Sequence, residues 1–337
     1  MTTKFDQLCS LLAQAPGAVI LQTHDVPDPD AIAAAFGLQY LLAQRSIASR
    51  IVYNSRIEKS DTRAMLELFG IQLTELGNRA GSGQTDSISD NDWAVLVDSQ
   101  KNSGNVLDLP SLEVAVIDHH SRRNDVQWQF ADIRPEVGSC STMIAGYFFE
   151  NKIEPPPNIA TALLYGIFID TDYLLRGVSK TDTEAFCKLH PLADQNKLRT
   201  LRSSQLTLQD LTLYANGFSK VQVYDNVGFL ELGPANDSLI GSANDLLLSV
   251  QEVEVALCYS LRETDVKFSI RSSNPRVQAN ELAKFICNGY GFGGGHSHMA
   301  GGCLSRAKLP ALRPAGLFIQ HRCISFLEQV QSGSAAE

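Results

Sequence analysis

The fold of this chain is decided by two short apolar stretches, Asp92-Trp93-Ala94-Val95-Leu96-Val97-Asp98 and Glu113-Val114-Ala115-Val116-Ile117-Asp118. Each is a continuous apolar run that ends in an aspartate, which is typical of a strand buried on both faces. Ala18-Val19-Ile20-Leu21 and Arg50-Ile51-Val52-Tyr53 are further strands of this kind, and Asp30–Gln44 reads as a helix between them. The alternation predicts an open α/β fold whose parallel sheet is covered on both faces.

The second half of the chain has a different pattern, with shorter alternating segments that indicate a smaller α+β domain. The strands expected there are Val221–Tyr224, Val227–Leu230, Val253–Tyr259 and Val266–Ile270. We expect a catalytic domain over residues 1–190, a polar linker over 191–215 and a second domain over 216–330.

Composition narrows the class of protein. The 337 residues include 37 acidic and 28 basic side chains, for a net charge of −9. This balance argues against a broadly basic surface for duplex nucleic acid, although a local cluster or metal ions could still hold an anionic substrate. The sequence lacks a run of about 18 apolar residues, a secretory signal and a CxxC pair. We therefore expect a cytoplasmic protein that does not contact membranes; a homodimer is compatible with the sequence.

Polar side chains follow the predicted strands, at the edge where open α/β sheets bind ligands. These are His24, Asp28 and Asp30 after Leu21, Asp98 after Val97, Asp118, His119 and His120 after Ile117, and Asp170 after Phe168-Ile169, taken as a fourth strand end. Gathered carboxylates raise one another's pKa unless a cation lies between them. A His/Asp set without cysteine favours manganese, magnesium, cobalt or iron over structural zinc, and more than four ligands indicate two ions.

Each of these residues has a structural alternative when it is taken alone. Asp30 could cap the helix that begins at Ala31, and Asp98 could be a turn residue. A lone histidine is more often structural than metal-bound. The shared placement at one sheet edge favours a metal centre, with the ligands His24, Asp28, Asp30, Asp98, His119 and Asp170.

A second group of candidate residues lies near the C-terminus, in the glycine-rich stretch Phe292–Gly302. Glycine N–H groups can surround a phosphate, and a helix that began near His296 would add its dipole. A tight turn is the alternative. Arg271 could bind a phosphate with two guanidinium nitrogens, its alternative being an exposed surface arginine. No acidic residue stands between Glu281 and Glu328, which suits an anionic ligand.

In this order the motifs resemble those of the DHH/DHHA1 phosphoesterase superfamily. Asp118-His119-His120 resembles the signature motif, and the others are His24-x3-Asp28-x-Asp30-Ala31, Val97-Asp98, Gly166–Thr171, Arg271-Ser272 and Gly293–His296. The resemblance spans about Ala18 to Gly302. It implies an N-terminal parallel-sheet DHH domain and a smaller α+β DHHA1 domain, with the active site in the cleft between them.

The resemblance also implies roles for the residues. Manganese is the expected metal, with magnesium and cobalt as alternatives. One ion would be held by His24, Asp28 and the bridging Asp98, and the other by Asp30, Asp98, His119 and Asp170. His120 would face the scissile phosphate, and Asp118 would orient a neighbouring histidine. The substrate would be bound by Arg271, Ser272, Gly293, Gly294, Gly295 and His296.

Size favours one group within the superfamily. RecJ-type exonucleases carry further domains, and membrane-bound cyclic-dinucleotide phosphodiesterases need spanning segments, which leaves a chain similar to the nanoRNase/pAp phosphatase group. The expected substrates are short single-stranded oligonucleotides or small nucleotides. The alternatives are a pyrophosphate or polyphosphate hydrolase and a catalytically silent nucleotide-binding regulator.

The nanoRNase/pAp phosphatase group usually has glycine where Asp172 stands. Asp172 could be an additional acid beside the metal ligands, or its side chain could point into a following helix, and we favour the second alternative. The role of His298 stays open.

Overall fold

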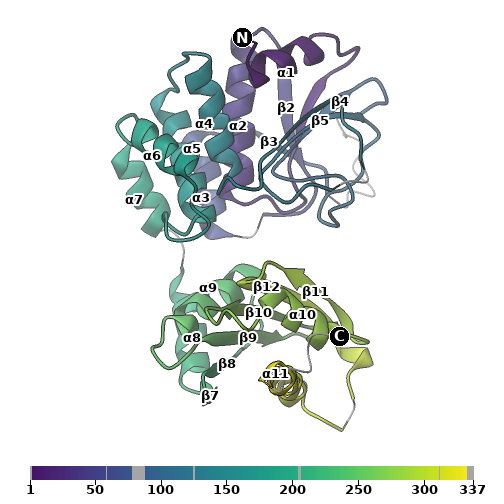
Figure 1. The fold of residues 1–337 in the computed structure, drawn as a ribbon, viewed down its shortest axis with the longest axis vertical. Helices are drawn as coiled ribbons and strands as arrows, with labels where there is room; N and C mark the ends of the chain where they lie inside the picture. The colour runs from purple at the N-terminus through teal and green to yellow at the C-terminus, as the bar shows by residue number, and fades with distance from the viewer. Residues whose placement is uncertain are drawn as a thin grey trace. The chain divides into compact units, whose positions relative to one another are not determined.

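The computed structural model describes residues 2–57, 59–77, 88–123, 126–203, 206–310 and 312–331 (Figure 1). Contacts divide the chain into two compact units, residues 1–205 and 206–337. The expected linker over residues 191–215 contains helix α7 (Gln195–Ser203) and most of α8 (Leu208–Phe218). Among the described residues, no helix has the length and apolar character needed to cross a bilayer.

The first unit is built on a six-stranded sheet in which every pairing is parallel (Figure 1). Its strands are β1 (Val19–Gln22), β2 (Ser49–Tyr53), β3 (Leu73–Glu75), β4 (Trp93–Val97), β5 (Leu112–Asp118) and β6 (Phe130–Ile133). The predicted parallel α/β fold is thereby confirmed. The strand order is β3-β2-β1-β4-β5-β6, so the winding direction reverses between β1 and β4. In such a sheet, ligands bind beyond the carboxyl ends of the strands at the point of reversal.

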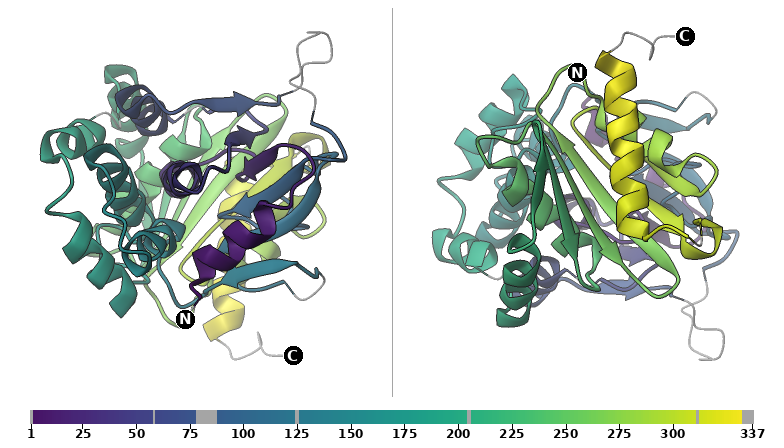
Figure 2. Two further views of the ribbon diagram at one scale, coloured as in Figure 1. Left: turned by 90° about the horizontal axis from the view of Figure 1, so that it is seen from above. Right: turned by 90° about the horizontal axis from the view of Figure 1, so that it is seen from below.

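Helices cover one face of this sheet (Figure 2, left). They are α1 (Lys4–Leu12), α2 (Pro29–Gln44), α3 (Ser60–Phe69), α4 (Cys140–Glu150), α5 (Pro157–Asp170), α6 (Lys180–Leu189) and α7. Helix α2 contacts α4, α5 and β1. On the other face, the buried residues Ile20, Val52 and Ala94 pack with partly buried side chains, those of Leu76, Ile88 and Leu109. Both faces are thus covered, but helices cover one and loop side chains contribute to the other.

The second unit contains a mixed six-stranded sheet of order β11-β12-β10-β9-β8-β7, in which only the β8–β9 pairing is parallel. Its strands are β7 (Gln222–Tyr224), β8 (Val227–Leu232), β9 (Val255–Leu261), β10 (Asp265–Ser272), β11 (Gly291–Gly295) and β12 (Met299–Ser305). Helices α8 and α9 (Asp237–Leu248) cover one face, and α10 (Ala279–Cys287) and α11 (Ala315–Gln331) cover the other. Figure 2 shows α11 (right panel, yellow) crossing its face of the sheet. The predicted second α+β domain is confirmed.

The glycine-rich stretch is a β-hairpin, so the helix considered near His296 does not form, and no helix dipole adds to the site there. Gly291–Gly295 pairs antiparallel with β12, and His296 lies in the connection that follows β11. Gly295 has a φ of +144°, and an added Cβ would lie 2.5 Å from the Met299 carbonyl oxygen. Only glycine fits this close approach of two strands, and such approaches explain glycine in an extended segment.

Candidate metal centre

The six predicted metal ligands gather beyond the carboxyl ends of β1, β4 and β5. Asp98 follows β4 directly, and His119 follows β5 directly. Asp170 was predicted at a strand end, and that prediction was wrong, because Asp170 is the last residue of helix α5. A helix buried on nearly all sides has the same uninterrupted apolar pattern as a buried strand, so periodicity cannot distinguish them.

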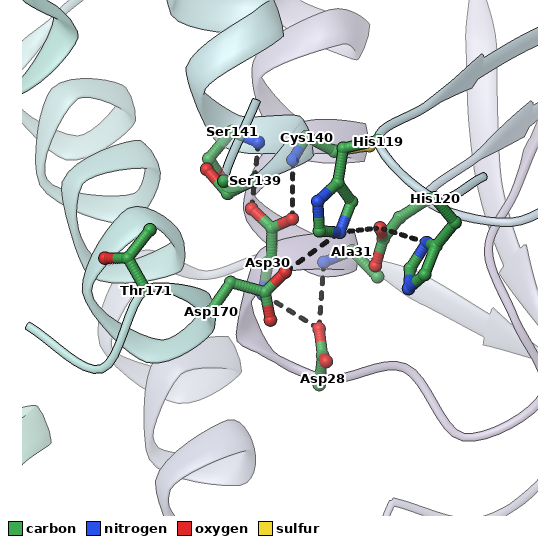
Figure 3. Close-up of polar contacts among 12 residues, drawn as sticks. Asp28, Asp30, Ala31, His119, His120, Ser139, Cys140, Ser141, Asp170 and Thr171 are labelled. Atoms are coloured by element: carbon green, nitrogen blue, oxygen red, sulfur yellow. Dashed lines mark hydrogen bonds and ion pairs between the residues drawn. The ribbon is translucent and has the colours of Figure 1, made fainter. Parts of the chain in front are cut away.

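Asp98 lies between the two predicted ligand histidines. Its Oδ2 is 3.8 Å from His24 Nε2, and its Oδ1 is 3.3 Å from His119 Nε2. His119 Nε2 is also 3.0 Å from Asp170 Oδ2 (Figure 3). Asp98 has a left-handed φ of +59°, which aspartate tolerates better than most residues. Strained backbone of this kind concentrates at functional sites, where the surrounding structure maintains it.

Two helix N-termini fix the carboxylates of Asp28 and Asp30 (Figure 3). Asp28, and not Asp30, is the N-cap of α2: its Oδ1 accepts hydrogen bonds from the N–H groups of Asp30 and Ala31 at 3.0 and 3.1 Å. The Asp30 oxygens accept from the N–H groups of Cys140 (2.7 Å) and Ser141 (2.8 Å), which begin α4. A carboxylate oxygen has two lone pairs, so each of these acids can accept such bonds and still ligate a metal.

Burial and mutual repulsion disfavour the charged form of the acids in this group. Burial raises the pKa of Asp30 well above its ordinary value, and the nearby carboxylates of Asp170 and Asp98 raise it further. Burial likewise raises the pKa of Asp170 to about 6, although His119 opposes the shift. Asp98 Oδ1 and His119 Nε2 are buried atoms whose contacts are ion pairs with each other and, for His119, with Asp170, and neither makes a hydrogen bond of regular geometry. Divalent cations would neutralise the acids and occupy these atoms, so the side chains fit a metal centre.

We expect the affinity of this centre for Mn²⁺ to fall as the pH decreases from 8 to 6. Burial alone would lower the pKa of His119, but the adjacent Asp170 and Asp98 carboxylates raise it, so His119 carries a proton in the metal-free protein. Metal must displace that proton and any proton held by Asp30 or Asp170, and lower pH favours the protonated forms. Calorimetric titrations with Mn²⁺ in two buffers of different ionisation enthalpy should detect proton release. Binding without proton release would contradict the assignment of His119 as a ligand.

A second set of contacts surrounds His120. Its Nδ1 lies 2.9 Å from Asp118 Oδ1, so the histidine that Asp118 orients is His120. Burial would raise the pKa of Asp118, but the hydrogen bonds from His120 and Gln100 hold it below its ordinary value. Sequence reasoning missed Gln100, which donates from Nε2 to Asp118 Oδ2 at 2.6 Å. It also missed Cys140, whose buried thiol lies near Asp30 and Asp98, within 4.8 Å.

Asp172 adopts a left-handed conformation with a φ of +49°, as do the next two residues, Tyr173 and Leu174. A positive φ gives a physical reason for the glycine that the related group has here. The residues after Asp172 form a turn, and α6 begins only at Lys180, so the helix expected directly after Asp172 is absent there. Among the described residues, Asp172 is in none of the groups close enough to share a metal ion.

The predicted substrate-binding residues lie at one end of the second sheet. Arg271 is only 11% exposed in its side chain, and its guanidinium group bonds to Asp245 Oδ1 at 2.5 Å and to Ser269 Oγ at 2.8 Å. It is therefore not an exposed surface arginine. The N–H of Ser272 donates to the His298 carbonyl oxygen at 2.9 Å, and this bond holds the β11–β12 connection beside the end of β10.

A pocket of about 410 Å³ opens over the glycine strands of the second unit. Its floor includes Gly293 and Gly294 of β11 and Gly301 and Gly302 of β12. Sequence reasoning missed Lys267, which also lines the pocket. Asp237 lines the pocket as well and lies 3.3 Å from Lys267, so the two charges offset each other. The glycines suit a flat ligand, because they let it approach the backbone closely.

Comparison with known proteins identifies the family to which each of the two units is similar. Residues 18–167 match the model of the DHH family, N-terminal domain, and residues 226–315 match the model of the DHHA1 domain. The chain belongs to the DHH/DHHA1 superfamily.

Among its relatives is an uncharacterized protein of Methanocaldococcus jannaschii, 29% identical over 296 residues, which are 87% of this chain and 58% of the relative. A probable manganese-dependent inorganic pyrophosphatase of Lactococcus lactis is 27% identical over 158 residues, 45% of this chain and 48% of the relative. The chain thus spans about half the length of these proteins. An exopolyphosphatase-related protein from Bacteroides fragilis has the same fold, with a TM-score of 0.73, 16% identity and 97% of each chain covered.

Proposed function

We propose that this protein is a metal-dependent phosphoric ester hydrolase that cleaves short single-stranded oligonucleotides or small nucleotides. The observation that carries the proposal is the centre around Asp98, where a buried carboxylate lies between two histidines and among acids that need a cation. We assign one metal to His24, Asp28 and Asp98. The other is assigned to Asp30, Asp98, His119 and Asp170.

The residues of the chain have distinct parts in this chemistry. Two divalent ions held by these residues would lower the pKa of a bound water and would offset the negative charge on the oxygens of the phosphoryl and leaving groups. Asp118 accepts from Nδ1 of His120, which leaves Nε2 to exchange a proton with the substrate. The hydrogen bond to Asp118 raises the pKa of His120, so this residue can carry a proton near neutral pH.

The second unit supports a nucleotide rather than a bare phosphate. We assign substrate binding to Arg271, Ser272, Gly293, Gly294, Gly295 and His296, beside a pocket large enough for a ring system. That this unit and the metal centre close on the substrate together stays a prediction.

Inorganic pyrophosphate or polyphosphate is the second candidate substrate. The match to a probable manganese-dependent inorganic pyrophosphatase favours it. A substrate panel with Mn²⁺-loaded protein separates the candidates: di- to pentaribonucleotides, pAp and dinucleotides against pyrophosphate and polyphosphate. Turnover of the inorganic substrates alone would replace the proposal by the second candidate, and nucleotide binding without turnover would favour a silent regulator.

We expect Arg271→Ala to raise KM for a dinucleotide by roughly 10- to 100-fold, the usual cost of losing a charge-assisted contact. Hydrolysis of any inorganic substrate should change little, because the catalytic centre is intact. Steady-state kinetics on both substrates measure the difference. Arg276→Ala, which removes an exposed arginine of the same unit, is the control. Equal KM values in Arg271→Ala and the wild type would contradict the assigned role.

A further inference from the structure

Gln100 connects the ends of two neighbouring strands beside the metal centre. It follows Asp98 by two residues beyond β4 and is only 3% exposed. Its Nε2 donates to Asp118 Oδ2 at 2.6 Å and to the Ser121 carbonyl oxygen at 3.1 Å, and its Oε1 accepts from the Arg123 N–H at 2.9 Å. The amide therefore bonds to the end of β5 and to two points in the segment that follows.

These bonds place Gln100 at one end of a hydrogen-bond network that reaches His120 through Asp118. The other oxygen of Asp118, Oδ1, lies 2.9 Å from His120 Nδ1 and accepts from the His120 N–H at 3.3 Å. Asp118 is completely buried, and a buried carboxylate needs a donor on each oxygen. Gln100 supplies that donor without adding charge, so both Asp118 oxygens are engaged in fixed directions.

The hydrogen bonds at position 100 require a neutral side chain that both donates and accepts, as glutamine does. A glutamate would bring a second carboxylate against Asp118, where it could no longer donate. A methionine of similar length would leave Asp118 Oδ2 without a partner and would release the backbone of Ser121 and Arg123. Methionine would thus remove all three hydrogen bonds, whereas glutamate could keep only the one from the Arg123 N–H.

We propose that Gln100 is a positioning residue, which orients Asp118 and through it holds the imidazole of His120 toward the reacting phosphate. The part concerning phosphate rests on the proposed function; the orientation of the ring does not. Outer partners of this kind typically change metal affinity or activity by about 10- to 100-fold. Gln100 contacts none of the assigned metal ligands by a hydrogen bond that the structure records, so the effect is expected in kcat.

The kinetic test uses Gln100→Met and Gln100→Glu in the full chain with Mn²⁺. We expect kcat to fall about 10- to 100-fold, while KM and the dissociation constant for Mn²⁺ stay within about threefold. The matched control is Gln22→Met. Gln22, the last residue of β1, is 2% exposed and donates at 2.6 Å to the Leu107 carbonyl oxygen, so its substitution also removes a buried amide from a neighbouring strand end. A kcat loss equal to that of Gln22→Met, or one that follows lost Mn²⁺ binding, would overturn the proposal.

A double-mutant cycle with His120→Asn tests whether Gln100 acts through His120. If it does, the double variant should be no slower than His120→Asn alone, because the oriented group is already absent. Multiplied losses would overturn the proposal.

Long-range ¹H–¹⁵N spectra of the histidine rings supply a readout that needs no turnover. We expect His120 to carry its hydrogen on Nδ1 in the wild type and to lose this preference in both Gln100 variants, with Gln22→Met unchanged. An unaltered His120 tautomer in folded Gln100→Met would refute the inference. An inactive wild type with the expected spectra would instead refute the proposed function.

Discussion

Asp98→Asn is expected to lower kcat for Mn²⁺-dependent hydrolysis by at least about 10³-fold and to weaken Mn²⁺ binding. Asp98 is the one carboxylate assigned to both metals, and its oxygens lie toward His24 and His119. Asparagine tolerates the left-handed φ of this position, so the fold should persist. Kinetics and calorimetric Mn²⁺ titration measure the two losses.

Asp172→Asn is the control for this substitution. It removes a carboxylate near Asp170 that is exposed and also has a positive φ, so activity should stay within about threefold of the wild type. Circular dichroism checks that both variants are folded. Turnover by Asp98→Asn at the wild-type rate would show that Asp98 does not bridge two metals.

Mn²⁺ at about 100 times its dissociation constant is expected to raise the free energy of unfolding by about 2.7 kcal/mol for each site. The reason is that the metal binds the folded protein, where the candidate ligands are gathered, and not the unfolded chain, where they are dispersed. Thermal unfolding at pH 8, with Mn²⁺ and with a chelator, measures the difference as a shift of several degrees in Tm.

Asp98→Asn should lose most of this increment, which separates binding at the centre from weak binding elsewhere. The same Tm with Mn²⁺ and with chelator in the wild type would mean that these acids do not hold the metal. A smaller increment at pH 6 is expected, because the pKa of Asp170 is about 6 and a larger fraction of this carboxyl group then carries a proton that metal must displace.

Four of the six strands of the first unit, β1, β2, β4 and β5, were predictable because they leave apolar runs that are largely buried, whereas β3 and β6 are only partly buried and were missed. β4 and β5 are the strongest of these runs, and each ends beside a residue of the site. The second unit was less predictable. Its β11 is made almost entirely of glycine, which carries no strand signal, and its pairing with β12 depends on residues of both strands.

The sequence by itself determined the α/β class and the DHH/DHHA1 resemblance, and it predicted the side chains of the candidate metal centre, because strand periodicity and short motifs can be read directly from the chain. The tertiary structure alone decided that α4 holds Asp30 and that Gln100 reaches Asp118. The physical reason is that these are contacts between groups far apart along the chain. Burial and a hydrogen bond form there only once the strands and helices have packed.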